Sequence, residues 1–283
     1  MDRRNLEEGF FKIIMAGSAI ITVMSLIFIL STVFIKGLPA LSIDMIIKTP
    51  QGGYYIGREG GILNAILGSL AIGTGATALA LAVSLPVVFY LHIYRRKKSK
   101  FSKMVRFFLD VLWGVPSIVY GAFGFTVMIF FGLKASLIAG IFTVALLIIP
   151  IMARSIDETL RMIPFEMNES CLALGSTRWE LAAKVITRQA FPGILTAALI
   201  SFGRGIGDAA SVLFTAGFTD YIPYSLFKPV ATLPLAIFFQ LGTPFPEVRQ
   251  RGYASALVLT LLILAVSVVA RLMSKKFVRN IIK

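Results

Sequence analysis

Apolar residues in this 283-residue chain gather in long runs that are separated by short basic segments. Each run is about 20 residues or longer, which is the length that an α-helix needs to cross a hydrocarbon core about 30 Å thick. A helix also satisfies its own backbone hydrogen bonds, as lipid requires. The runs lie at residues 13–35, 62–94, 107–133, 135–153, 191–218 and 252–270. The pattern therefore predicts an all-α polytopic membrane protein with six transmembrane helices.

The composition supports a membrane protein and excludes several other classes. Hydrophobic residues make up 57% of the chain and charged residues 15%, whereas a soluble domain is about half apolar and about a quarter charged. Cys171 is the only cysteine, so a disulfide scaffold is excluded. The apolar excess excludes a disordered chain.

The basic residues are distributed unevenly between the two sets of segments that connect the spans. Of the 28 lysines and arginines, 20 fall in segments 1–12, 95–106, 154–190 and 271–283. Seven fall in segments 36–61, 134 and 219–251, and Arg204 lies inside a span. Because basic residues concentrate on the cytoplasmic side of a membrane, both termini are expected in the cytoplasm. The charges follow the membrane edges, which indicates contact with anionic lipid and not with nucleic acid.

The spans and charges divide the chain into three parts. Residues 1–59 are expected to form an N-terminal transmembrane helix and a first external loop, and residues 60–273 a core of five transmembrane helices. Residues 274–283 are expected to form a basic cytoplasmic tail. The first apolar run has 23 residues, more than the 7–15 of a signal peptide, so it is interpreted as a retained helix.

Segment 154–190, within the core, is too polar to span the membrane and too long for a simple turn. Gly175 follows a helix-compatible stretch at the position where a residue with positive φ ends a helix. Thr177 and Glu180 fit the capping box that starts the next helix. The segment is therefore predicted to form a helix, a glycine corner and a second helix. It is either a connector on lipid headgroups or a docking element for a cytoplasmic partner; tethering between two spans argues against a DNA-binding helix-turn-helix.

The charges inside the fifth run carry the prediction about function. An arginine at the centre of a membrane helix costs about 2.5–3.5 kcal/mol, so such residues usually face a polar path. Arg204 and Asp208 are four residues apart and share a helix face. Ser201, Ser211 and Thr215 continue that face, which predicts a polar stripe along a translocation pathway. We expect Arg204 to bind a tetrahedral oxyanion through its planar fork and Asp208 to orient it; alternatively, the two charges neutralise each other while holding helices together.

Motifs for catalysis and nucleotide binding are absent from the sequence. No stretch matches the phosphate-binding loop G-x-x-x-x-G-K-[ST]. No cluster of His, Cys and carboxylates has metal-ligand spacing, and no serine in a span has a plausible base. We therefore expect a protein that is not an enzyme, holds no metal or cofactor, and relies on another subunit to hydrolyse ATP if its transport is active.

Residues Glu169 to Gly175, followed by Ala190-Phe191-Pro192, resemble the cytoplasmic "EAA" loop of ABC-importer permeases, with Ser170 and Cys171 in place of two alanines. Three further stretches resemble phosphate permeases of the PstA type: Gly60 to Ser69, Val115 to Gly121 and Phe202 to Ala210. In the last of these, Asp208 stands where that family has Glu, and Ala209 and Ser211 replace its Thr and Pro. The resemblance covers about residues 60–273.

This resemblance implies a type I ABC importer permease fold in a prokaryotic inner membrane and a pathway for inorganic phosphate. It also implies three partners: a second homologous permease, a cytoplasmic ABC ATPase dimer and an extracytoplasmic phosphate-binding protein. The ATPases would bind the corner formed by Glu169, Gly175, Ser176 and Thr177. Sulfate or molybdate import remains an alternative. An ion-coupled secondary transporter or a channel is another, although the chain lacks the internal repeat typical of such transporters.

Overall fold

The computed structural model of the protein describes residues 3–51, 60–94 and 99–278. Every long element in these ranges is a helix, and they contain no β-strand. Part of the first external loop (52–59), part of the basic run after the second span (95–98) and the end of the basic tail (279–283) lie outside the described residues.

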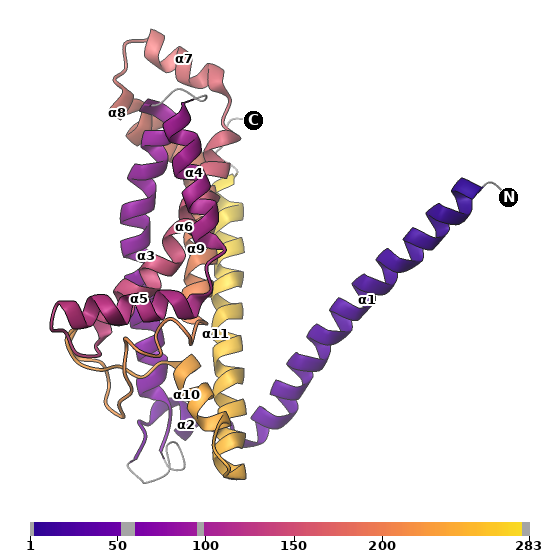
Figure 1. Cartoon of the computed structure of the whole chain (residues 1–283), viewed down its shortest axis with the longest axis vertical. Helices are drawn as coiled ribbons and strands as arrows, with labels where there is room; N and C mark the ends of the chain where they lie inside the picture. The colour runs from indigo at the N-terminus through magenta and orange to yellow at the C-terminus, as the bar shows by residue number, and fades with distance from the viewer. Residues whose placement is uncertain (1–2, 52–59, 95–98, 279–283) are drawn as a thin grey trace.

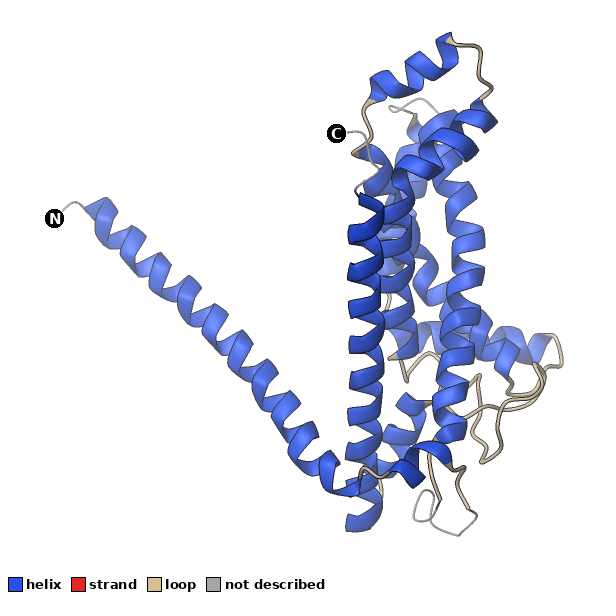
Figure 2. Ribbon diagram, turned by 180° about the vertical axis from the view of Figure 1, so that it is seen from behind, coloured by secondary structure: helices blue, strands red, loops and turns tan. Residues whose placement is uncertain are grey.

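Four long helices run side by side along the long axis of the molecule (Figures 1 and 2). They are α3 (Leu63–Phe89), α6 (Leu137–Arg161), α9 (Thr187–Ile206) and α11 (Pro246–Val278). Helix α6 is the most deeply buried of the candidate spans and packs against α3 and α9. Its fully buried residues Val144, Ile148 and Met152 belong to the main hydrophobic core.

Small residues allow these helices to approach one another closely. A Cβ on Gly73 of α3 would lie 2.9 Å from the ring of Phe202 on α9. A Cβ on Gly205 of α9 would lie 2.9 Å from the Val144 side chain on α6. Such contacts are typical of membrane helices, where lipid and leucine are equally apolar and close packing holds helices together.

Helix α1 (Arg3–Gly37) diverges from the bundle (Figure 1). It meets α11 at its C-terminal end, where a Cβ on Gly37 would lie 2.6 Å from the carbonyl oxygen of Tyr253. None of its most apolar 18-residue window is buried. The short helices η1 (Leu38–Ala40) and α2 (Ile43–Ile47) follow at the same end of the bundle. Apart from this C-terminal end, the apolar surface of the predicted first span is exposed in the described chain.

The span predicted over residues 107–133 is not one continuous helix. The region forms α4 (Lys100–Trp113) and α5 (Ser117–Phe130), which are bent by 101° relative to each other. Pro116 lacks an N–H and disfavours a helical conformation at the residue before it, so α4 ends at Trp113 with Gly114 as its C-cap. Helix α5 consequently runs across the bundle (Figure 1).

The prediction of a helix over residues 191–218 is wrong in its second half. Helix α9 ends at Ile206, and residues 208–218 form turns and irregular structure. Gly205 and Gly207 weaken the helix at this point. Long-range hydrogen bonds hold the following segment: the Asn64 side chain donates to the Thr219 carbonyl at 2.7 Å, and the Ser136 amide donates to the Thr215 carbonyl at 2.9 Å.

Helix α9 is continuous with the second helix that was predicted to start at the Thr177 capping box. It continues backwards through the π-helical segment η3 (Leu181–Ile186) to α8 (Arg178–Glu180), which gives a span of 29 residues. Helix α6 likewise extends beyond the predicted 135–153 to Arg161. Within the described residues, five helices are long and apolar enough to cross a membrane, and the bent α4–α5 pair gives up to six. The predicted all-α, six-span architecture is consistent with this count.

The connecting elements lie at opposite ends of the bundle (Figure 1). Helix α7 (Phe165–Ala173), α8, the start of α4 and the C-terminal end of α11 share one end. Helices α2 and α10 (Leu233–Leu241) lie at the other. Basic segment 154–190 and the described part of the basic tail, up to residue 278, are therefore brought to the same end.

Candidate functional site

A glycine corner projects from the end of the bundle that carries α7 and α8 (Figure 1). Gly175 has φ +86°, and two hydrogen bonds close the end of α7 around it. The Gly175 amide donates to the Leu172 carbonyl at 3.0 Å and the Ser176 amide to the Cys171 carbonyl at 3.3 Å. This pair of bonds satisfies carbonyls that a helix end leaves without intrahelical donors. The predicted helix and glycine corner are confirmed.

The predicted capping box at the next helix is also confirmed. The Thr177 hydroxyl accepts a hydrogen bond from the Glu180 amide at 3.2 Å, and the Glu180 carboxylate accepts one from the Thr177 amide at 3.1 Å. These reciprocal bonds fix where the chain enters the helix. Ser176 is half-buried and Glu169 is exposed. The corner is therefore joined firmly to the long helix that runs from α8 to Ile206.

Large apolar side chains are exposed around this corner. Leu174 is 88% exposed and Trp179 is 68% exposed, and Leu172 nearby is also exposed. Exposed apolar groups gathered at the tip of a projecting element indicate a contact surface for another protein. The sequence analysis did not identify these residues as a contact surface. Apolar residues on both sides of Gly175, in an otherwise polar segment, could have indicated it.

Arg204 lies in the last turn of α9, where its positive charge is favourable next to the helix C-terminus. Its side chain is exposed on the surface of the isolated chain and has no hydrogen bond or ion pair with any described residue. The neighbouring surface is open, because a Cβ placed on Gly203 would meet nothing within 4 Å. The guanidinium keeps its five N–H donors for a ligand or a partner chain.

The structure does not bring the other predicted pathway residues to the same surface. Because the helix ends at Ile206, Asp208 does not share a helix face with Arg204, and its carboxylate accepts a hydrogen bond from the Ser211 amide at 2.7 Å. Ser201, Ser211 and Thr215 are fully buried. The prediction of one continuous polar stripe is wrong, and no ion pair joins Arg204 to Asp208 in the described part of the chain. A role for these four residues in transport stays a prediction.

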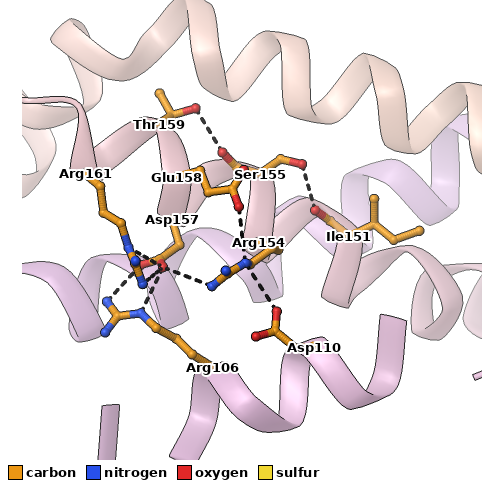
Figure 3. Close-up of polar contacts among 9 residues, drawn as sticks. All are labelled: Arg106, Asp110, Ile151, Arg154, Ser155, Asp157, Glu158, Thr159 and Arg161. Atoms are coloured by element: carbon orange, nitrogen blue, oxygen red, sulfur yellow. Dashed lines mark hydrogen bonds and ion pairs between the residues drawn. The ribbon is translucent and has the colours of Figure 1, made fainter. Parts of the chain in front are cut away.

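A charged cluster around one buried carboxylate, Asp157, lies between α4 and α6 (Figure 3). Asp157 is 1% exposed. Arg106 on α4 binds it through two hydrogen bonds of 2.9 Å, one from Nε and one from Nη2. Arg161, one turn further along α6, donates from Nε at 3.0 Å and lies 2.8 Å away through Nη2. A carboxylate with these partners fastens α4 to the end of α6.

Arg154 forms the second half of this cluster (Figure 3). Its Nε lies 3.3 Å from a carboxylate oxygen of Asp110 on α4 and 3.3 Å from one of Glu158 on α6. The spacing of Arg154, Asp157, Glu158 and Arg161 along one helix was visible in the sequence. The α4 partners were not, because Arg106 lies 51 residues from Asp157 and meets it only in the folded chain.

Comparison with known proteins assigns this architecture to a family. Residues 85–283 match the family described as binding-protein-dependent transport system inner membrane component. The chain is 34% identical to the phosphate transport system permease protein PstA of Haemophilus influenzae over 256 residues, which is 90% of this chain and 89% of that protein. It is 31% identical to PstA of Mycobacterium leprae over 94% of this chain and 88% of that protein.

Solved structures with the same fold come from bacterial ABC transporters. A chain of an alginate ABC transporter in complex with its pentasaccharide-bound periplasmic protein aligns with a TM-score of 0.66 and 12% identity, covering 96% of each chain. A chain of the inward-facing MetNI methionine ABC transporter aligns with a TM-score of 0.63 and 18% identity, covering 76% of this chain and 95% of that one. The fold is that of type I ABC importer permeases. The chain belongs to the family of binding-protein-dependent transport system inner membrane components and, within it, to the PstA permeases.

Proposed function

We propose that this chain is the membrane-spanning permease subunit of an ATP-driven importer of inorganic phosphate. The observation that carries the proposal is similarity over nearly the whole chain to permeases named for phosphate transport. The chain has no phosphate-binding loop of its own, so a partner ATPase supplies the ATP hydrolysis. An extracytoplasmic phosphate-binding protein delivers the anion, and both termini of the permease lie in the cytoplasm of a prokaryotic cell.

Arg204 is the proposed contact for phosphate in the pathway. Its guanidinium is exposed and without an acceptor in the described part of the chain, and a planar fork of N–H donors suits a phosphate oxyanion. A second, homologous permease would cover this surface, so that the pathway lies between two bundles. The exposed apolar surface of α1 supports such a partner, because an apolar helix that contacts its own chain only at one end has surface available for another chain.

The corner around Gly175 is the proposed docking site for the ATPase dimer, through Leu174 and Trp179 with Glu169, Ser176 and Thr177. One helical path joins this corner to the substrate contact, because the span from Arg178 to Ile206 carries Arg204 in its last turn. At 1.5 Å per residue, its 29 residues extend about 43 Å. ATP-driven movement of the corner would therefore tilt the helix that holds Arg204.

Anion competition in a reconstituted system tests the proposed substrate. The chain would be assembled with the ATPase, the second permease and the binding protein in proteoliposomes, and ATP-dependent uptake of radioactive phosphate measured. We expect uptake that excess unlabelled phosphate abolishes and that sulfate and molybdate leave unchanged. Competition by sulfate or molybdate at equal concentration would assign the permease to another tetrahedral anion. Uptake that continues without ATP would place it among channels or ion-coupled transporters.

A pair of glycine substitutions tests the docking corner. Gly175 and Gly132 both have positive φ, +86° and +67°, and a Cβ on either would meet nothing within 4 Å. Alanine at either site therefore adds the same kind of backbone strain, about 1–2 kcal/mol. We expect Gly175→Ala to lower phosphate-dependent ATP hydrolysis and Gly132→Ala to leave it unchanged. Equal effects of the two changes would argue against a specific role for the corner.

A further inference from the structure

A basic pocket lies where three elements meet at the end of the bundle that carries α7. The elements are the π-helical turn η2 (Tyr90–Tyr94), the first turns of α4 and the end of α6. The pocket encloses about 400 Å³ and is lined by Leu91, His92, Lys103, Arg106 and Arg161. It is far along the chain from Arg204 and separate from the Gly175 corner, so neither proposed site accounts for it.

The cations of this pocket exceed the anions that balance them. Arg106 and Arg161 share one carboxylate, Asp157, and each uses its Nε and Nη2 for it. The Nη1 groups of both arginines are left without an acceptor among the described residues. Lys103 is exposed and has no ion pair there either. Asp110 and Glu158 both pair with Arg154, which also lies 3.9 Å from Asp157, so they offset one of these charges and an excess of one remains.

The counter-charge that fits this arrangement is a phosphate group. With the adjoining Arg154, Asp110 and Glu158 included, four cations face three carboxylates, which leaves an excess of one positive charge, and a phosphate group is an anion at neutral pH. Guanidinium forks and an ammonium group bind phosphate oxygens through charge-assisted hydrogen bonds. Met104 and Phe107, on the same helix as Lys103, are 49% and 62% exposed, so the pocket borders a surface on which acyl chains can lie. Basic pockets between membrane helices bind lipid headgroups in this way.

We propose that this pocket binds a phosphate group, carried either by an anionic lipid headgroup or by free hydrogen phosphate. The bound group contacts Lys103 and Arg106 on α4 and Arg161 at the end of α6. It thereby strengthens the junction between α4 and the helix that leads into α7. The pocket lies at the same end of the bundle as the docking corner. The phosphate group can bind there whether or not the permease is transporting.

Direct binding measurements on the full-length chain in nanodiscs test this proposal and separate the two sources. One arm measures retention of phosphatidic acid against phosphatidylcholine by native mass spectrometry. The other measures equilibrium binding of radioactive orthophosphate in phosphatidylcholine nanodiscs, with Arg204→Gln as the background so that the proposed pathway contact does not contribute. Retention of phosphatidic acid alone identifies a headgroup site, and binding of orthophosphate identifies a site for the free anion.

Lys103→Gln is the deciding variant, because Lys103 has no ion pair in the described chain whose loss would disturb the fold. Lys100→Gln is its matched control: it removes the same charge one turn earlier on α4 and outside the pocket lining. We expect Lys103→Gln to weaken binding about tenfold, as for the loss of one charge-assisted hydrogen bond, and Lys100→Gln to leave it unchanged. Failure of both probes to bind, binding that Lys103→Gln does not weaken, or equal weakening by both changes overturns the proposal.

Discussion

Arg106 and Arg204 are both arginines on helices of the membrane domain, yet their surroundings are opposite. Arg106 is largely buried and makes two hydrogen bonds to a carboxylate that is itself buried. Arg204 is exposed and makes none within the described part of the chain. A paired, buried arginine contributes to the fold, whereas an unpaired one in a membrane protein is a candidate for function. Charge within an apolar segment therefore does not identify a pathway until its partners are known.

The largest effect is expected at the buried carboxylate. Asp157→Ala would leave Arg106 and Arg161 next to each other without their shared acceptor. Breaking a buried ion pair from one side costs about 3–5 kcal/mol, so we expect a much lower unfolding temperature and poor yield of folded protein. Thermal unfolding of the purified chain measures this. Unchanged stability would show that the cluster does not hold α4 to α6.

A change at Arg204 should lower transport and leave stability unchanged, whereas the change at Asp157 lowers stability. Arg204→Lys keeps the charge but loses the planar fork. We expect ATP-dependent phosphate uptake to fall about tenfold, the effect of one lost charge-assisted hydrogen bond, while the unfolding temperature stays the same. If uptake were unaffected, charge alone would account for the contact.

Asp208 offers an intermediate test, because the structure assigns its carboxylate to the Ser211 amide. Asp208→Ala removes this hydrogen bond and should cost about 1 kcal/mol of stability. Asp208→Asn retains an acceptor oxygen and should leave both stability and uptake nearly unchanged. A large loss of uptake in the Asn variant would mean that the negative charge acts on the pathway after all.

The smallest effect is expected at the rim of the buried cluster. Glu158 is 60% exposed and pairs with Arg154 at 3.3 Å. Exposed ion pairs contribute about 0–1 kcal/mol, so Glu158→Gln should shift the unfolding temperature little. A shift as large as that of Asp157→Ala would show that the six charges act as one network and not as a buried pair with a solvated rim.

The parts of the fold that follow from contiguous residues were predictable from the sequence. The Gly175 corner and the Thr177 capping box depend on residues within one or two turns of each other, and both have the expected geometry. Long apolar runs likewise identified the spans. Pro116 was a visible signal for the break between α4 and α5, but its 101° angle depends on what α5 packs against.

The parts that depend on distant residues were not predictable. Nothing near Asp208 in the sequence shows that the Asn64 side chain holds the Thr219 carbonyl, 155 residues away. Helical spacing alone therefore placed Ser211 and Thr215 on one face with Arg204, although tertiary hydrogen bonds take them out of the helix. The same holds for Arg106 and Asp157, which only the packing of α4 on α6 brings together.

Arg204 is expected to serve transport and not folding. ATP-dependent phosphate uptake per folded complex, measured for Arg204→Gln beside the control Arg271→Gln, tests it most directly. Arg271 is also exposed, near the far end of α11. We expect Arg204→Gln to abolish uptake without changing the unfolding temperature or assembly with the ATPase, and Arg271→Gln to behave like the unchanged protein. Uptake by Arg204→Gln equal to that of the unchanged protein would contradict it.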